Sequence, residues 1–209
     1  MGRHQYLQER IAGPACSIVF LADGRRSLVL GISRQIVGSR AFGASGFRYC
    51  GSLMGPGLFR AEAALRRRAE ELAEAVARSF RLVGLNGIDF IGRGGVPWPI
   101  EVNPRFSASM ELLERFSDAS LFALHEAGCR GRLPASAPRS PKEVVGKAVV
   151  FARRDVTTGD TRRRLGDPGV ADIPQPGQRI ARGRPICTVF ASGRDAAACL
   201  RALEARAAA

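Results

Sequence analysis

The alternation of apolar and polar residues predicts a β-hairpin near the start of the chain. Residues 17–21 and 27–30 are short runs rich in β-branched and apolar side chains, and the turn-forming sequence Ala22-Asp23-Gly24-Arg25 separates them. Two such runs around a short glycine-containing turn are typical of a hairpin. The glycine-rich stretch from Gly43 to Gly57 is expected to form irregular loops.

A long amphipathic helix is predicted over residues 58–81. Its apolar positions recur at intervals of three and four, which places them on one face of a helix. These positions are Leu65, Ala69, Leu72, Val76 and Phe80. Arginines and glutamates fill the opposite face, so the arginine triplet at 66–68 is interpreted as part of a solvated surface.

Two short strands and a tight turn follow this helix. Residues 86–91 and 97–102 are predicted as the strands, and Arg93-Gly94-Gly95 as the turn. Pro97 and Pro99 are two residues apart, so their missing N–H groups fall on one edge of the second strand.

The rest of the chain is predicted to contain both helices and strands. Two short helices are expected within 107–131, strands at 144–152 and 185–190, and an alanine-rich helix at 194–208. The core candidates of the two short helices are Met110, Leu113, Leu121 and Leu124.

These elements indicate an α+β fold, and the family resemblance carried by residues 85–106 implies an antiparallel sheet with flanking helices, followed by a small β-rich domain. The first domain is expected over residues 1–132, and a proline- and serine-rich linker over 133–142. The second domain, closed by the terminal helix, is expected over 143–209.

The composition excludes several classes of protein. The chain has 209 residues with 45% hydrophobic and 24% charged residues, which are ordinary values for a globular protein. No apolar run reaches the roughly 18 residues of a membrane helix, and the start lacks the apolar core of a signal peptide. We therefore expect a cytoplasmic protein. The five cysteines are scattered and indicate small buried hydrophobic residues rather than a zinc or redox site.

The net charge of +13 comes almost entirely from arginine, because Lys142 and Lys147 are the only lysines. A strongly basic surface attracts nucleotides and nucleic acids over long distances. The arginines are spread along the chain, however, and no recognition helix or RNA-binding signature is present. A basic nucleic-acid-binding module therefore remains an alternative that the sequence does not favour.

The residues with the most informative chemistry are Asp89 and the run from Glu101 to Arg105. Side chains at positions i, i+2 and i+4 of a strand point to the same face, so Glu101 and Asn103 project together, with Arg105 nearby unless Pro104 turns it away. In a hairpin centred near Gly95, Asp89 lies opposite Glu101 or one step from it.

Two carboxylates this close repel each other, and a divalent cation removes the conflict. Mg²⁺ prefers oxygen ligands and is usually held by one or two carboxylates together with substrate phosphates. Asp89, Glu101 and Asn103 are therefore candidate metal ligands, and Arg105 is a candidate contact to a transferring phosphate or a substrate carboxylate. The alternative is a solvent-exposed hairpin that carries acids with no metal.

The segments Leu85-Asn86-Gly87-Ile88-Asp89-Phe90 and Pro99-Ile100-Glu101-Val102-Asn103-Pro104-Arg105-Phe106 resemble the metal-binding end of the ATP-grasp superfamily. The ExNPR form is most similar to the biotin-carboxylase-related branch. The resemblance implies Asp89 and Glu101 as paired metal carboxylates, Asn103 as the third ligand and Arg105 as a catalytic contact. It also implies ATP and Mg²⁺ as cofactors, with Mn²⁺ as the substitute ion.

Segment 6–13 resembles the hinge strand that holds adenine and ribose in this superfamily, with Gln8, Glu9 and Ile11 at the matching positions. Segments 31–35 and 47–52 are also similar to a subgroup of small amino-acid ligases that includes tyramine–glutamate ligase.

The resemblance implies a carboxylate–amine ligase that works through an acyl-phosphate intermediate. Its partners would be ATP and small-molecule carboxylate and amine substrates, with no membrane. A hinge beginning at residue 6 leaves no room for a preceding glycine-rich loop and lysine, so we expect a missing N-terminal half or a partner subunit. Alone, the chain is expected to be weakly active or inactive. A non-catalytic nucleotide-binding domain is the second alternative.

Overall fold

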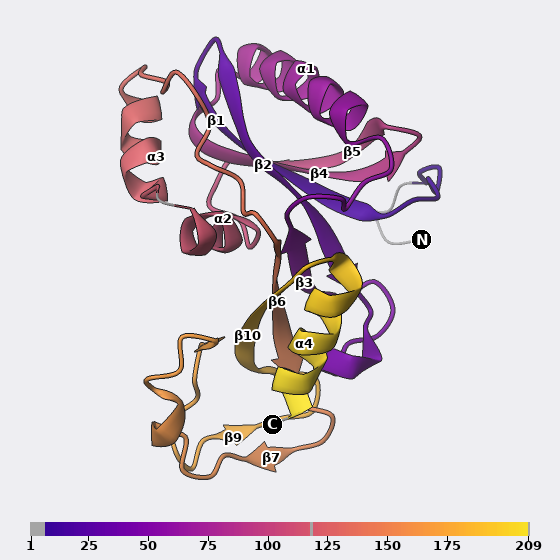
Figure 1. Cartoon of the computed structure of the whole chain (residues 1–209), viewed down its shortest axis with the longest axis vertical. Coiled ribbons are helices and arrows are strands. Elements are labelled where there is room, and N and C mark those ends of the chain that lie inside the picture. Colours follow the sequence, from indigo (N-terminus) through magenta and orange to yellow (C-terminus); the bar gives the residue numbers. More distant parts are fainter. Residues whose placement is uncertain (1–6, 118, 209) are drawn as a thin grey trace.

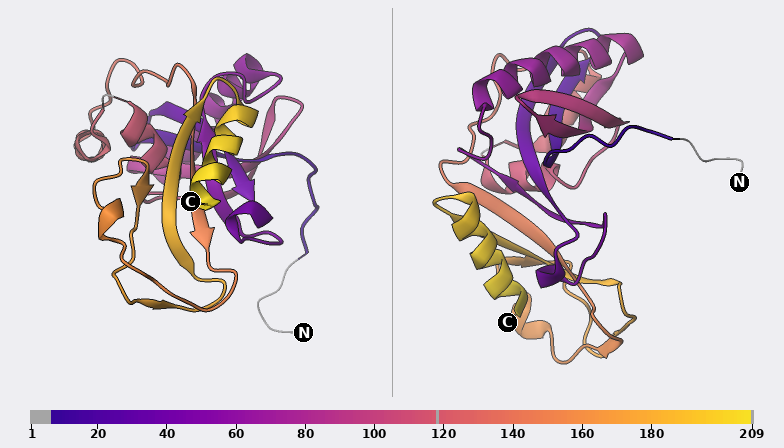
Figure 2. Two further views of the ribbon diagram at one scale, coloured as in Figure 1. Left: turned by 60° about the horizontal axis from the view of Figure 1, so that its bottom comes forward. Right: turned by 90° about the vertical axis from the view of Figure 1, so that its right-hand side faces the viewer.

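The computed structural model describes residues 7–117 and 119–208. Two lobes share one curved sheet, which in this described part has eight strands in the order β5-β4-β1-β2-β3-β6-β10-β8 (Figure 1). Figure 1 and the right-hand view of Figure 2 show α1 and α4 at opposite ends of this sheet. The predicted combination of an antiparallel sheet with flanking helices is therefore confirmed.

The first lobe contains two hairpins that lie next to each other in the sheet. Their strands are β1 (Ala15–Asp23), β2 (Ser27–Val37), β4 (Val83–Arg93) and β5 (Val96–Asn103). The hairpin predicted at the start of the chain is confirmed, and so is the one around Gly94-Gly95. β5 forms the edge of the sheet, which is where a strand with two prolines is tolerated.

Alternate side chains of β1 pack into two hydrophobic cores, one on each face of the sheet. Ile18 and Phe20 pack under α1 (Glu62–Phe80), whereas Val19 and Leu21 pack under α2 (Met110–Phe116) and α3 (Leu121–Cys129). The predicted core residues of the two short helices are fully buried except Leu124, which is partly buried. No helix in the described ranges is long and apolar enough to cross a lipid bilayer.

The buried stripe of α1 differs from the predicted one at its end. Leu65 and Ala69 are buried as expected, but the stripe continues through Ala73 and Ala77, and Phe80 is 67% exposed. Phe80 is three residues beyond Ala77 and is therefore turned by about 60° around the helix axis. The alanine row allows the helix to lie close to the sheet, and this packing decides the buried face.

The prediction of irregular loops over 43–57 is wrong for residues 49–54. This segment forms β3 (Tyr49–Met54), preceded by the short helix η1 (Arg40–Phe42). Glycine at position 51 hid the strand in the sequence, because isolated glycines weaken strand patterns. In the fold this glycine is needed, since a Cβ on Gly51 would lie 2.2 Å from the backbone oxygen of Lys147.

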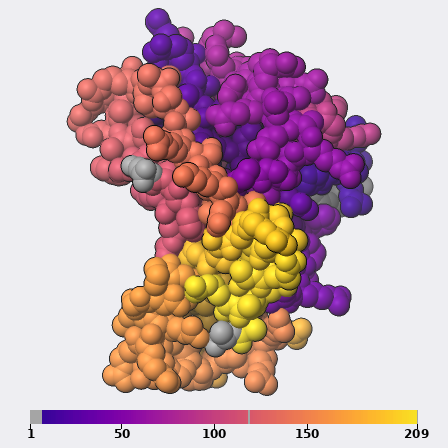
Figure 3. Space-filling view, viewed as in Figure 1, coloured from indigo at the N-terminus to yellow at the C-terminus, as the bar shows by residue number. Residues whose placement is uncertain are grey.

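The second lobe continues the sheet of the first, because β6 pairs with β3. Its elements are β6 (Val144–Phe151), β7 (Val156–Thr157), η2 (Arg162–Arg164), β8 (Val170–Ala171), β9 (Arg179–Ile180), β10 (Pro185–Gly193) and α4 (Ala196–Ala208). Residues 133–142 contain no helix or strand and run over the surface from α3 to β6 (Figure 3). The domain division at 133–142 stays a prediction, although strands on both sides of it belong to one sheet.

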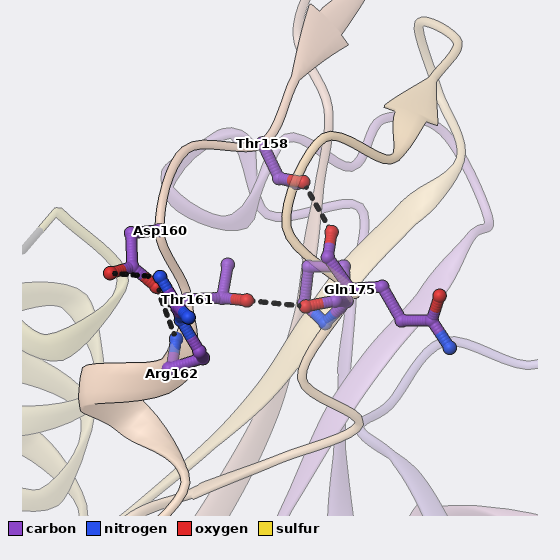
Figure 4. A network of polar contacts seen from close by, with 6 residues as sticks. Thr158, Asp160, Thr161, Arg162 and Gln175 are labelled. Carbon is purple, nitrogen blue, oxygen red and sulfur yellow. Dashed lines mark hydrogen bonds and ion pairs between the residues drawn. The ribbon is translucent and has the colours of Figure 1, made fainter.

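The turn-rich part of the second lobe is held by hydroxyl-to-carbonyl hydrogen bonds (Figure 4). Thr158 donates from Oγ1 to the backbone oxygen of Gln175 at 2.6 Å. Thr161 donates from Oγ1 to the backbone oxygen of Pro174 at 2.7 Å. Arg162, in the second arginine triplet, pairs with Asp160 at 2.9 Å. At least one arginine of this basic cluster is therefore paired with a neighbouring acidic residue.

Three of the five cysteines are the small buried residues that we expected. Cys16, Cys50 and Cys199 are buried, whereas Cys187 is half-buried and Cys129 is exposed. Burial raises the pKa of the Cys16 thiol to about 12, which keeps it protonated and inert. The expectation is wrong for Cys129, which is exposed and has its Sγ atom 3.6 Å from Nε2 of His125 on the same helix.

Candidate metal and nucleotide site

Asp89 and Glu101 lie directly opposite each other on β4 and β5. The register of this hairpin is set by the Gly94-Gly95 turn, where both glycines have positive φ angles of 60° and 72°. Residues directly opposite in an antiparallel pair have their Cβ atoms about 4.5–5.5 Å apart on the same face. The fold therefore brings two carboxylates together at an edge of the sheet.

Asn103, the last residue of β5, lies between the two acids and is 8% exposed. Its Nδ2 atom donates to Glu101 Oε1 at 3.1 Å and lies 3.5 Å from Asp89 Oδ2. The three residues proposed from the sequence as metal ligands thus share one small cluster. The described residues hold no group of three or more His, Cys, Asp or Glu side chains suited to a metal, so the amide is needed to complete the set.

Arg105 stays beside this cluster because Pro104 does not turn it away. Its Nη2 atom donates to Asn103 Oδ1 at 3.0 Å, and its Nη1 atom donates to the backbone oxygen of Phe106 at 3.2 Å. The residue is otherwise exposed. The guanidinium therefore faces the same space as the two carboxylates.

The environment of Asp89 disfavours its charged form. Burial raises the pKa of this carboxyl most, and the nearby negative charge of Glu101 raises it further. The hydroxyl of Ser17 and the charge of Arg105 lower the pKa, but they do not compensate. Gln35 supports the carboxylate by donating from Nε2 to Oδ1 at 3.1 Å.

The raised pKa of Asp89 predicts a gain in stability when its charge is removed. A carboxyl whose pKa is higher in the folded state than in the unfolded state destabilises the fold once the pH rises above its unfolded pKa. Asp89→Asn is therefore expected to raise the melting temperature at pH 7 in metal-free buffer. The gain should shrink as the pH falls towards 3.8, the ordinary pKa of the group. Thermal unfolding of both proteins between pH 3.5 and 8 checks this, and equal melting temperatures at pH 7 would contradict it.

A cavity of about 180 Å³ opens over the cluster, and five of the residues that line it carry hydroxyl groups. Its hydroxyl-bearing residues are Ser17, Tyr49, Ser52, Ser107 and Ser109. Sequence reasoning missed all five, although Ser17 carried a weak signal as a polar residue at the start of an otherwise apolar strand. Tyr49 and Ser52 lie in a segment that was expected to form a loop. Although residues 47–52 are similar to a segment of small amino-acid ligases, neither side chain was predicted to line the site.

A second, larger cavity of about 730 Å³ contains the residues that we expected to hold the nucleotide base. Gln8, Glu9 and Ile11 line it together with Trp98 and Ile100. Trp98 and Ile100 are 43% and 54% exposed, so a flat apolar surface is open to a ligand. Gln35 lines both cavities, which places them next to each other.

The hinge strand expected over 6–13 does not form in the described part of this segment. Residues 7–13 belong to no strand, and β1 begins at Ala15. Residues 7–10 are exposed. Tyr6 lies outside the described residues.

Comparisons with known proteins identify the family and the fold of this chain. The family model of the ATP-grasp domain matches residues 1–109, a range that includes both expected ligand groups. An uncharacterized protein of Methanocaldococcus jannaschii is 28% identical over 121 residues, which are 58% of this chain and 29% of that protein. The chain therefore spans less than a third of the length of this curated relative.

Solved structures with the same fold are larger proteins. The N5-carboxyaminoimidazole ribonucleotide synthetase of Thermus thermophilus has a TM-score of 0.63 and 18% identity, with 93% of this chain and 49% of that chain covered. A single-chain, multi-domain long-chain acyl-CoA carboxylase has a TM-score of 0.67 and 16% identity, with 96% and 23% covered. The urea amidolyase of K. lactis has a TM-score of 0.65 and 12% identity, with 91% and 12% covered.

The TM-scores show that this chain shares its fold with these three proteins. The family model covers just over half of the chain. This chain belongs to the ATP-grasp domain family, a family of ATP-binding domains of ligase type.

Proposed function

We propose that this chain forms the Mg²⁺- and ATP-binding portion of a carboxylate–amine ligase that works through an acyl phosphate. The observation that carries the proposal is the cluster of Asp89, Glu101 and Asn103 on one face of an edge hairpin. Mg²⁺ bound to nucleotides is typically held by one or two carboxylates plus phosphate oxygens. Membership of an ATP-binding family supports the same assignment.

The residues present fit a magnesium ion after one side-chain rotation. Asn103 points its Nδ2 atom at the carboxylates and its Oδ1 atom at Arg105. A half-turn of the amide would give three oxygen donors directed at one point, and amide nitrogen and oxygen are close to isosteric. Asp89, Glu101 and Asn103 would hold the ion through these oxygen atoms, and Mn²⁺ would fit the same donor set.

The same rotation links metal binding to Arg105. The guanidinium donates to Asn103 Oδ1, and this hydrogen bond is lost when the amide turns its oxygen to a metal. Arg105 is then free to contact an anionic oxygen of the phosphate or of the substrate carboxylate, a task for which its planar fork of donors is suited. Metal occupancy and the catalytic arginine would therefore be coupled through one side chain.

The two cavities suggest how ATP would lie. Gln8, Glu9 and Ile11 would contact adenine and ribose in the larger cavity, with Trp98 offering an aromatic surface to the base. The phosphates would pass Gln35 and reach the hydroxyl-lined cavity above Asp89. Serine and tyrosine hydroxyls in that cavity provide hydrogen bonds to phosphate oxygens or to the carboxylate substrate.

The chemistry requires positioning rather than a protein nucleophile. In the proposed reaction a substrate carboxylate oxygen attacks the γ-phosphorus of ATP, ADP leaves, and an amine then displaces phosphate from the acyl phosphate. Mg²⁺ supplies neutralisation of the phosphate charge when it is bound. Arg105 orients the reacting oxygens, and the hydroxyl groups replace water around them.

Metal-dependent nucleotide binding tests the proposal directly. Isothermal titration of the chain with ATP is expected to give at least tenfold tighter binding in 5 mM Mg²⁺ than in EDTA, because the ion removes the repulsion between phosphates and carboxylates. In Mn²⁺, NMR signals of residues around Asn103 should broaden first.

A basic protein binds polyanions without a specific site, so a control is needed. Inorganic triphosphate at raised ionic strength measures this background, because contacts between exposed charges weaken with salt. Equal ATP affinity with and without Mg²⁺ would contradict the proposed function and favour a non-metal nucleotide site or a basic binding surface.

A further inference from the structure

The polar residues of the candidate site continue across the sheet to Lys147 on β6. Ser17 lies opposite Asp89, Gln35 lies opposite Ser52, and Ser52 lies opposite Lys147. Opposed side chains of neighbouring strands share a face. Lys147 is therefore on the same face as the hydroxyl-lined cavity, although 58 residues of sequence separate it from Asp89.

Lys147 is buried in an ion pair with Glu111. Its Nζ atom donates to Glu111 Oε2 at 2.7 Å, and the two side chains are 7% and 38% exposed. A buried ammonium group is costly unless it is paired. The pair joins α2 to β6 at a point where the lysine has little freedom to move.

A second contact fixes the same face of α2. Arg115, one helical turn after Glu111, lies 3.9 Å over the ring of Phe190 on β10 and donates to the backbone oxygen of Pro168. Residues four apart lie on one face of a helix. Both contacts therefore hold α2 against strands of the second lobe, where Figure 1 shows it beside the junction of the two lobes.

The position of α2 determines the position of the site loop. Residues 104–109 connect Asn103, the end of β5, to Met110, the start of α2. This loop carries Arg105 and two of the serines that line the cavity. It is anchored at one end by the pairing of β5 with β4 and at the other end by α2.

We propose that Lys147 is a positioning residue of the site, which acts through Glu111 to hold α2 and thereby the loop 104–109 over the carboxylate cluster. The second lobe thus sets the geometry of a site whose proposed ligands all lie in the first. The effect on nucleotide binding rests on the proposed function, whereas the effect on the loop does not.

Hydrogen exchange of the ligand-free chain tests the effect on the loop. Lys147→Met keeps a long side chain but removes the charge, and the amides of residues 105–109 are expected to exchange about tenfold faster. The exchange rates of the β4 amides should be unchanged. A general loss of stability would instead accelerate exchange both in the loop and in β4. Lys142→Met is the matched control, since Lys142 is the other lysine and is exposed. Unchanged exchange in the loop would overturn the proposal.

Nucleotide binding supplies the second readout. Lys147→Met is expected to weaken Mg²⁺-dependent ATP binding about fivefold, and Lys147→Arg should restore most of it. Glu111→Gln should give a similar loss, and combining it with Lys147→Met should add little, because both remove one interaction. Fully additive losses would overturn the proposal and make Lys147 a direct ligand contact.

Two further outcomes remain decisive. If Lys147→Met does not fold, as judged by circular dichroism, hydrogen exchange of residues 105–109 in Glu111→Gln tests the proposal instead. Glu111 is the more exposed partner, so its replacement disturbs the core less. If the wild-type chain shows no Mg²⁺-dependent ATP binding, the proposed function fails, while loop exchange still supports or overturns the positioning role.

Discussion

Replacing Glu101 with glutamine is expected to weaken Mg²⁺-dependent ATP binding by about 30- to 100-fold. The change keeps the shape of the side chain and its partner Asn103 Nδ2, which lies 3.1 Å from Glu101 Oε1. It removes the negative charge of one of the two carboxylates that we propose as metal ligands. Loss of a charged partner costs roughly 2 to 2.7 kcal/mol, which is about 30- to 100-fold in affinity. Titration of both proteins with ATP in Mg²⁺ and in EDTA measures the effect.

The loss should be confined to metal-dependent binding. In EDTA, Glu101→Gln is expected to bind ATP as well as the wild type or slightly better, because a negative charge near the phosphates is gone. Glu74→Gln on the exposed face of α1 makes the same change of charge far from the cavity and should have no effect. Equal losses in Mg²⁺ and EDTA would show that Glu101 acts without a metal.

The core of the candidate site could be predicted because its parts are close in sequence. Asp89, Glu101 and Asn103 lie within one hairpin, and strand alternation with a two-glycine turn is enough to place them on one face. The structure confirms this register. Local patterns of this kind depend on backbone geometry alone, so no knowledge of the remaining fold was needed.

The walls of the cavity could not be predicted, because they depend on the order of strands in the sheet. Gln35, Ser52 and Lys147 come from β2, β3 and β6, and the observed order brings them into one row. No periodic pattern in the sequence predicts that β3 pairs with β6, because a long connection separates the two strands. From the sequence alone Lys147 was only a residue that follows the metal ligands, and its burial beside the site was not foreseen.

Packing also explains where the predicted core differs from the observed one. Helical spacing selected both Ala69 and Phe80, and only the sheet beneath α1 distinguishes them. The small side chains of Ala73 and Ala77 allow a close approach that a larger residue would prevent. Helical spacing therefore included Phe80 in the predicted buried face, whereas the close packing of α1 on the sheet buries the smaller alanines.

Replacing Gly51 with alanine is expected to destabilise the chain by about 3 kcal/mol or more and to loosen the junction of the lobes. The new Cβ would lie 2.2 Å from the backbone oxygen of Lys147 and 3.0 Å from the Cα atom of Ala148. Both are backbone atoms of β6, so no side-chain rotation relieves the clash, and overpacking of this kind typically costs 1–3 kcal/mol or more. A chain of this length should lose roughly 6–12 °C in melting temperature.

The position of the clash predicts where the structure should open. β3 joins the two lobes through its pairing with β6, and the connection at 133–142 leads into β6, so separation of these strands should loosen this connection. Limited proteolysis of Gly51→Ala should therefore cut within 133–142 faster than in the wild type and release a fragment that begins near β6. Gly159→Ala is the matched control, because a Cβ at Gly159 meets no atom within 4 Å. A Gly51→Ala protein with wild-type melting temperature would show that β3 and β6 do not approach as closely as the structure places them, and the anchoring of Lys147 beside the site would lose its basis.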